Sequence, residues 1–247
     1  MPDAKDESII THLEELRSTL IKCFCAVGIV LPFAFLISPK ALSFIIKILV
    51  GNNNITLNYF TPMEVFILQI KLAFLIDVII CFPYISKQLW NFILPALYEK
   101  EKTIIKSMVI TSSILFTLGV IFCMFTILPL LINFGMSFAS NNIQAVFGIS
   151  NVVSLALWLS FTFGLMFQVP LIVYFLIKWG IISYESVQSK RPYVVIGLLV
   201  IAAIITPPDI ISQTMLFTPT YLLFELGLFF SKNLKIEEQN QIDELKN

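Results

Sequence analysis

Charged residues are scarce in this sequence. Only 13% of its 247 residues are Asp, Glu, Lys or Arg, whereas 57% are hydrophobic; a soluble domain has about 25% charged residues. This composition excludes an ordinary soluble domain and indicates a polytopic membrane protein. The net charge is zero, so the overall charge gives no reason to expect nucleic acid as a partner.

Residues that bind metals or nucleotides are scarce as well. The four cysteines, Cys23, Cys25, Cys81 and Cys123, lie in or beside apolar runs, and with the single histidine, His12, they show no metal-ligand spacing. We therefore expect free thiols, no metal site and no cofactor. The sequence lacks a glycine-rich phosphate loop and a candidate serine nucleophile near His12, which argues against an enzyme.

Long apolar runs fill most of the chain. Because about 20 apolar residues cross a hydrocarbon core of about 30 Å as a helix, we predict an all-α membrane protein with six transmembrane helices. The predicted domain covers residues 1–235, and a polar C-terminal tail covers residues 236–247. The expected spans are about 20–37, 65–89, 107–134, 152–178, 194–205 and 210–230. The last two are short, and the first of these reaches only about 18 Å, so we expect a locally thin bilayer or neighbouring helices around it.

An amphipathic helix, residues 9–19, precedes the first span. Apolar residues recur along one of its faces, as expected for a helix lying at the membrane surface. Ser38, Pro39 and Lys40 are expected to end the first span. The ten apolar residues that follow, 41–50, are too few to cross a bilayer, so we predict a separate interfacial helix.

The positions of the basic residues predict the orientation. All but three of the sixteen Lys and Arg residues fall in segments that share one side with the N-terminus; the exceptions are Lys40, Lys47 and Lys71. Because cytosolic segments are enriched in basic residues, both termini are predicted to be cytoplasmic. The acidic N-terminus does not have the composition of a secretory signal or transit peptide. We expect a bacterial inner (plasma) membrane, with an organellar membrane as the alternative.

A charged segment, residues 90–106, separates the second and third spans. Its sequence, WNFILPALYEKEKTIIK, contains Glu99, Lys100, Glu101 and Lys102 in succession. This segment is where a charged ligand would bind, because transferring a charge into the hydrocarbon on either side costs a large amount of free energy. From the residues alone, the alternative that these are ordinary solvated charges stays open.

Five motifs together resemble the TatC family, the membrane receptors of the twin-arginine protein translocase. They occur in order along the chain: THLEELR at 11–17, WNFILPALYEKE at 90–101, FGLMFQVPL at 163–171, KRPYVVIG at 190–197 and TPPDIISQTMLFTPTYLLFELG at 206–227. The resemblance implies a cup-shaped helical protein that binds twin-arginine signal peptides of folded proteins. It also implies single-span TatA and TatB partners, self-association in a larger complex, contact with membrane lipid and use of the proton-motive force.

The resemblance implies two sets of site residues. Those for signal-peptide binding are Glu15, Glu101, Leu16, Arg17, Phe92, Pro95 and Tyr98, with the two glutamates binding arginine. Those for intramembrane polar or partner contacts are Gln168, Thr206, Asp209 and Gln213. The family usually has glutamate where this chain has Gln168, so hydrogen bonding is expected there but not ionisation, because an amide does not titrate.

Other interpretations remain open for several polar residues. A secondary solute transporter would explain intramembrane polar groups but should contain a second pair of broken helices, and a structural scaffold would leave the charged segment without a role. Thr206, Asp209 and Gln213 would, alternatively, satisfy backbone groups freed by neighbouring prolines. Asp77, in the second span, is expected to face a water-accessible concave side, and Glu225 to cap a helix or pair with a neighbour.

Overall fold

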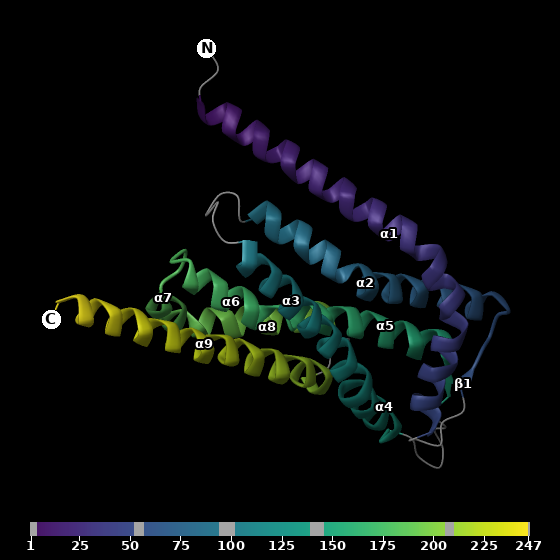
Figure 1. Ribbon diagram of the computed structural model, residues 1–247. Coiled ribbons are helices and arrows are strands. Elements are labelled where there is room, and N and C mark those ends of the chain that lie inside the picture. The colour runs from purple at the N-terminus through teal and green to yellow at the C-terminus, as the bar shows by residue number, and fades with distance from the viewer. Residues whose placement is uncertain (1–3, 52–56, 94–101, 139–145, 206–209, 247) are drawn as a thin grey trace. The chain divides into compact units, whose positions relative to one another are not determined.

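The computed structural model describes residues 4–51, 57–93, 102–138, 146–205 and 210–246, and almost all of them are helical (Figure 1). The helices are α1 (Ala4–Gly51), α2 (Met63–Ile93), α3 (Lys102–Phe122), the π-helical turn η1 (Cys123–Ile127), α4 (Leu128–Met136), α5 (Ile149–Met166), α6 (Val169–Lys178), α7 (Tyr184–Ser189), α8 (Arg191–Ile205) and α9 (Ile210–Lys246). Two short strands, β1 (Leu57–Asn58) and β2 (Phe147–Gly148), pair in parallel.

Five helical stretches in the described part of the chain are long and apolar enough to cross a membrane. They are His12–Leu49, Met63–Ile93, Ile105–Met136, Ile149–Lys178 and Gln213–Lys232. Helix α8 is also apolar but has only 15 residues, a length of about 22 Å. The prediction of an all-α, multi-pass membrane protein is confirmed, and the count of six spans stays a prediction.

Helix α1 continues through Pro39, contrary to the prediction that the first span ends there. The 48-residue helix contains both Pro32 and Pro39, and Figure 1 shows it bending in its C-terminal part. Pro39 cannot donate a hydrogen bond to the carbonyl of Phe35, four residues earlier. The Ser38 hydroxyl donates to that carbonyl instead, at 2.8 Å. The helix therefore bends without ending, and the predicted interfacial helix is its last part.

Two further features of the helices were not predicted. Helix α9 runs to Lys246, so most of the predicted polar tail, residues 236–247, is helical. This segment contains no proline or glycine and consists largely of good helix formers. The third apolar stretch contains the π turn η1, which ends two residues before Pro129 in the first turn of α4. The wider turn accommodates a proline that cannot donate a backbone hydrogen bond.

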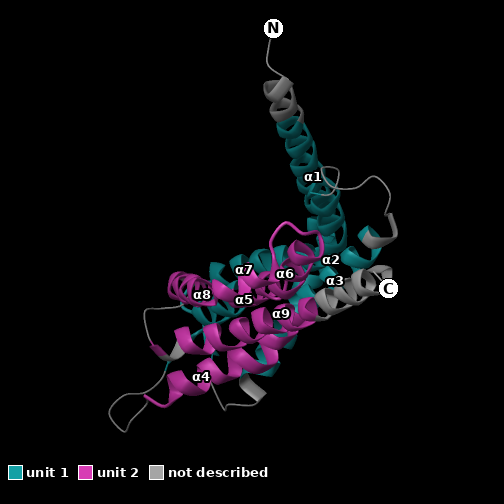
Figure 2. Cartoon of the chain, turned by 90° about the vertical axis from the view of Figure 1, so that its left-hand side faces the viewer, with its two compact units in different colours: residues 1–117, 139–158 teal, residues 118–138, 159–247 magenta. Residues whose placement is uncertain are grey.

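The helices divide into two compact units, shown in different colours in Figure 2. In the first unit, residues 1–117 and 139–158, α1 packs along α2, and Phe82 of α2 stacks on Phe116 of α3 with ring centroids 4.0 Å apart. In the second unit, residues 118–138 and 159–247, α9 packs against α6, α7 and α8.

Glycines allow two close backbone contacts within the second unit. A Cβ atom built on Gly119 of α3 would lie 2.5 Å from the carbonyl oxygen of Phe163 in α5. A Cβ atom on Gly227 of α9 would lie 2.7 Å from the Cα atom of Pro170 in α6. Since both neighbours are backbone atoms, these helices approach each other only because no side chain intervenes.

Candidate functional site

An aromatic stack joins the N-terminal part of α1 to the C-terminal end of α2. The imidazole of His12 lies on the ring of Phe92, with centroids 4.4 Å apart and an angle of 17° between the ring planes. His12 was assigned no specific role from the sequence, and Phe92 was predicted to shape the peptide-binding patch. The contact joins residues that are far apart in sequence.

Glu15 lies beside this stack. Its Oε2 atom is 3.8 Å from Nδ1 of His12, one helical turn earlier, and both side chains are about half exposed. Leu16 is half-buried and Arg17 is exposed on the following residues of the same helix. The structure therefore brings Glu15 and Phe92, two predicted site residues, to one place through His12. The other predicted residues of this set, Pro95, Tyr98 and Glu101, lie outside the described residues.

Gln168 occupies the break between α5 and α6. Pro170 cannot donate to the carbonyl four residues earlier, and the chain passes through Phe167 and Gln168 before α6 begins. The side chain of Gln168 is buried, and its Nε2 atom donates to the carbonyl of Gly164 at 3.4 Å. An amide is suited to this position because it forms hydrogen bonds without placing a charge inside the helix bundle.

Three partner-contact residues were predicted in the last two spans, and the structure describes the side chain of only one of them, Gln213. Its Nε2 atom donates to the carbonyl of Leu199 in α8 at 3.0 Å. This bond joins the N-terminal part of α9 to the backbone of α8, and its acceptor is not one of the carbonyls that the neighbouring prolines would free. Thr206 and Asp209 lie outside the described residues.

A polar cluster between α8 and α9 was not recognised from the sequence. Arg191 at the start of α8 forms an ion pair with Glu225 of α9, with Nη2 and Oε2 3.0 Å apart. The Tyr221 hydroxyl donates to the second carboxylate oxygen at 2.8 Å. The sequence did suggest that Glu225 pairs with a neighbour. Tyr221 could have been added to the cluster from the sequence, because residues four apart lie next to each other on a helix.

We expect Arg191→Met to lower the midpoint of thermal unfolding in detergent by a few degrees, because it leaves the half-buried Glu225 carboxylate without its cation. Glu225→Gln added to Arg191→Met should cause little further loss, since the two substitutions break one interaction. Lys190→Met, at the exposed neighbour, is the matched control. Fully additive losses would show that the ion pair does not hold α8 to α9.

Asp77 does not face water, contrary to the sequence-based expectation. Its side chain in α2 is completely buried. The Cys81 thiol donates to Oδ1 at 3.4 Å, while Oδ2 has no hydrogen-bond partner among the described residues. The buried neighbours of Asp77 on this helix, such as Ala73 and Val78, are mainly apolar. Asp77 is therefore a polar group inside the first unit and not part of an exposed site.

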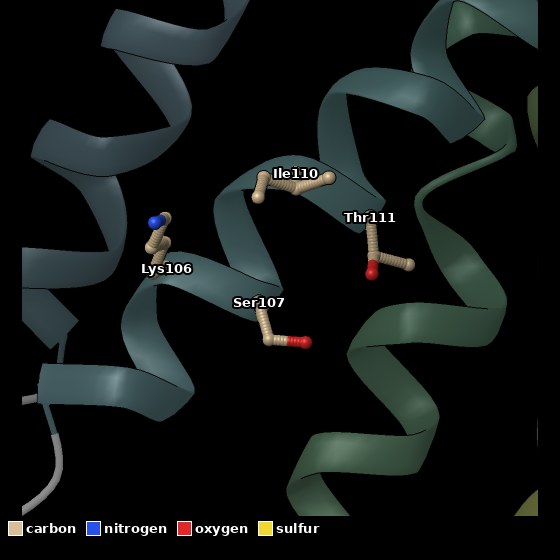
Figure 3. Close-up of a pocket in the computed structure, with 4 residues that line it drawn as sticks. All are labelled: Lys106, Ser107, Ile110 and Thr111. Atoms are coloured by element: carbon tan, nitrogen blue, oxygen red, sulfur yellow. The ribbon is translucent and has the colours of Figure 1, made fainter.

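The surface of α3 carries a shallow hollow of about 280 Å³. Its four lining residues are Lys106, Ser107, Ile110 and Thr111, and Figure 3 shows the Ser107 and Thr111 hydroxyls on the same side of the helix, one turn apart. All four belong to α3, so the described residues supply one wall of the hollow. Within the described part of the chain, no three His, Cys, Asp or Glu residues form a group that could hold a metal ion.

The fold and these sites define a multi-pass helical membrane protein whose polar groups serve contacts between segments. The family model described as "Sec-independent protein translocase protein (TatC)" matches residues 11–219. The chain therefore belongs to the TatC family. It is a component of a protein translocase and not an enzyme, and this membership does not favour the solute-transporter alternative.

Relatives and solved structures agree with this assignment over most of the chain. TatC of Escherichia coli K12 is 37% identical over 92% of this chain and 88% of its own length, and TatC of Helicobacter pylori is 33% identical over the same shares. A crystal structure titled as the twin arginine translocase receptor TatC in DDM superposes with a TM-score of 0.82 at 31% identity. It covers 89% of this chain and 99% of the solved one.

Proposed function

We propose that this protein is the receptor subunit of a twin-arginine translocation system. It binds the signal peptides of folded proteins at its cytosolic face and exports those proteins with TatA- and TatB-type partners, using the proton-motive force. It resides in a bacterial inner membrane with both termini in the cytoplasm, and it self-associates in a larger complex. Membership of the TatC family supports this proposal, as does the structural likeness to a protein titled as the twin arginine translocase receptor.

The observation that carries the proposal is the exposed Glu15 carboxylate beside the stack of His12 and Phe92. A guanidinium group presents a planar fork of donors that a carboxylate accepts through both oxygens. The 3.8 Å separation between Glu15 and His12 is longer than a hydrogen bond, so it leaves the carboxylate lone pairs available. An arginine side chain therefore has both a charge partner and an aromatic neighbour at this position.

A twin-arginine peptide requires a second carboxylate, and we assign that role to Glu101. This residue lies eight positions after the end of α2 and directly before the start of α3, and the segment that carries it starts at the helix end where Phe92 lies. Leu16, Arg17, Pro95 and Tyr98 shape the surface around the two acids. Because each exposed ion pair contributes only about 0–1 kcal/mol, two bidentate pairs that exclude water on binding are needed for selective recognition.

The intramembrane polar residues are proposed to contact the single-span partners. Gln213 uses its Nε2 atom within the chain, which leaves its amide oxygen to accept a hydrogen bond from a partner helix. Thr206 and Asp209 lie seven and four residues before it in sequence and complete this contact. Gln168 is buried at the break in the fourth span, and its contribution to partner binding is through the shape of that break.

The test of signal-peptide binding is site-specific photocrosslinking in membranes that contain the partner subunits. The photoreactive residue replaces Ser18, which is exposed and one turn from Glu15, so both acids stay in place. A precursor with two arginines should crosslink strongly, and a precursor with two lysines weakly. Glu15→Gln should reduce crosslinking of the arginine precursor about tenfold, equivalent to about 1.4 kcal/mol.

The matched control is Glu14→Gln, which removes a neighbouring exposed carboxylate of the same helix. It should leave crosslinking of the arginine precursor unchanged. If the two precursors crosslink equally, or if Glu14→Gln and Glu15→Gln have the same effect, then the surface responds only to net charge and the assignment of Glu15 is wrong.

A further inference from the structure

We infer that His12 is a positioning residue for Glu15, and that it sets the preference for arginine over lysine by holding this carboxylate against the end of α2. This inference rests on the proposed function, because it concerns the same peptide-binding surface. It assigns His12 no contact with the peptide itself. The imidazole acts through Glu15 on one side and through Phe92 on the other.

The first support is the stack with Phe92. Two rings at 4.4 Å and 17° form a stacked contact that contributes beyond simple burial. Among the neighbouring apolar residues of α1, Leu13 is 58% exposed and Leu20 is 44% exposed, while Leu16 is half-buried. The stack of His12 on Phe92 is therefore one of the contacts that hold this part of α1 to the C-terminal end of α2.

The second support is the contact with Glu15. His12 and Glu15 are three residues apart, a spacing that places their side chains next to each other on one face of a helix. At 3.8 Å, Nδ1 attracts the carboxylate when this nitrogen carries a proton, without occupying a lone pair as a hydrogen bond would. The side chain of Glu15 thus lies beside the His12 ring that stacks on Phe92, while both oxygens remain open to a guanidinium.

Orientation matters more for arginine than for lysine. A guanidinium gains its full interaction only when both carboxylate oxygens lie in its plane, whereas an ammonium group is a point charge that tolerates many directions. Loosening Glu15 should therefore weaken binding of twin-arginine peptides and affect twin-lysine peptides much less. A merely structural role for His12 would change the binding of both peptides together.

The experiment measures crosslinking of the two precursors from position 18 in the intact membrane complex, with three substitutions. His12→Ala removes ring and nitrogen, His12→Gln keeps a polar group without the ring, and His12→Phe keeps the ring without the nitrogen. We expect His12→Ala to reduce arginine-precursor crosslinking about tenfold with little change for the lysine precursor. We expect His12→Gln to behave like His12→Ala, and His12→Phe to keep the thermal midpoint but to lose arginine-precursor crosslinking about tenfold, because the ring without Nδ1 no longer orients Glu15.

A double substitution tests whether the effect passes through the stack. Phe92→Leu alone should reduce arginine-precursor crosslinking, and adding His12→Ala should reduce it little further, because both remove one contact. Independent losses at the two positions would overturn the inference. The inference is also wrong if Glu15→Gln reduces crosslinking while His12→Ala does not.

The failure of the inference is distinguishable from failure of the proposed function. If Glu15→Gln leaves the preference for arginine unchanged, the assignment of Glu15 as an arginine-binding residue is wrong. If His12→Ala prevents folding, His12→Phe still decides the question, since a folded His12→Phe variant that keeps the preference for arginine would show that Nδ1 does not position Glu15, and the inference would be wrong. Glu14→Gln again serves as the unaffected control.

Discussion

Gly119→Ala is expected to remove most of the folded protein from detergent extracts. The new Cβ atom would lie 2.5 Å from the carbonyl oxygen of Phe163 and 2.9 Å from the Cα atom of Gly164. Both are backbone atoms, so α3 and α5 would have to move apart within the second unit. Overpacking of this kind costs about 1–3 kcal/mol or more. The measurement is the midpoint of thermal unfolding, with the yield of monodisperse protein.

Gly197→Ala provides the matched control for this substitution. Gly197 lies in α8, in the same unit, and a Cβ atom built on it meets nothing within 4 Å. Alanine there should leave the thermal midpoint unchanged or slightly higher, because alanine favours helix by about 1 kcal/mol relative to glycine. Equal stability of both variants would show that α3 and α5 do not approach each other as closely as the structure indicates.

Asp77→Val is expected to stabilise the protein. An aspartate at the centre of a membrane helix costs about 2.5–3.5 kcal/mol on insertion scales. The buried carboxyl group of Asp77 has one contact with Cys81 and a second oxygen without a partner among the described residues. Replacing such a group by an apolar residue is often neutral or stabilising. The thermal midpoint should rise by several degrees.

Asp77→Asn separates charge from shape, because it keeps the size of the side chain and its unpartnered polar atom. It should stabilise the protein less than Asp77→Val. Export of a twin-arginine precursor should be measured for both variants, since a rise in stability with a loss of export would show that the carboxyl group serves transport. Destabilisation by both substitutions would mean that the carboxyl group has further partners, and the expected result would be wrong.

The sequence predicted the helices better than their ends. Apolar runs of sufficient length identify membrane helices because hydrocarbon admits only backbone that is hydrogen-bonded within the chain. The end at Pro39 was predicted wrongly because proline normally removes a hydrogen bond, and here the Ser38 hydroxyl supplies the missing one. That compensation depends on a rotamer, which sequence patterns do not reveal.

The candidate site was predicted as a set of residues but not as a geometry. The motifs identified Glu15 and Phe92, while the contact that joins them passes through His12 and depends on how α1 packs along α2. Asp77 shows the opposite case. A carboxylate in an apolar span suggested access to water, and only the packing of α2 within its unit shows that the side chain is enclosed.

The π turn η1 keeps the buried face of the third apolar stretch continuous. In a regular α-helix, which turns by about 100° per residue, Val120 and Ile132 would point about 120° apart. The wider turn between them offsets about one residue of rotation, and both side chains are buried. The additional residue thus brings the buried side chains of α3 and α4 onto one face. In a regular α-helix with the same sequence, these side chains would point in two different directions.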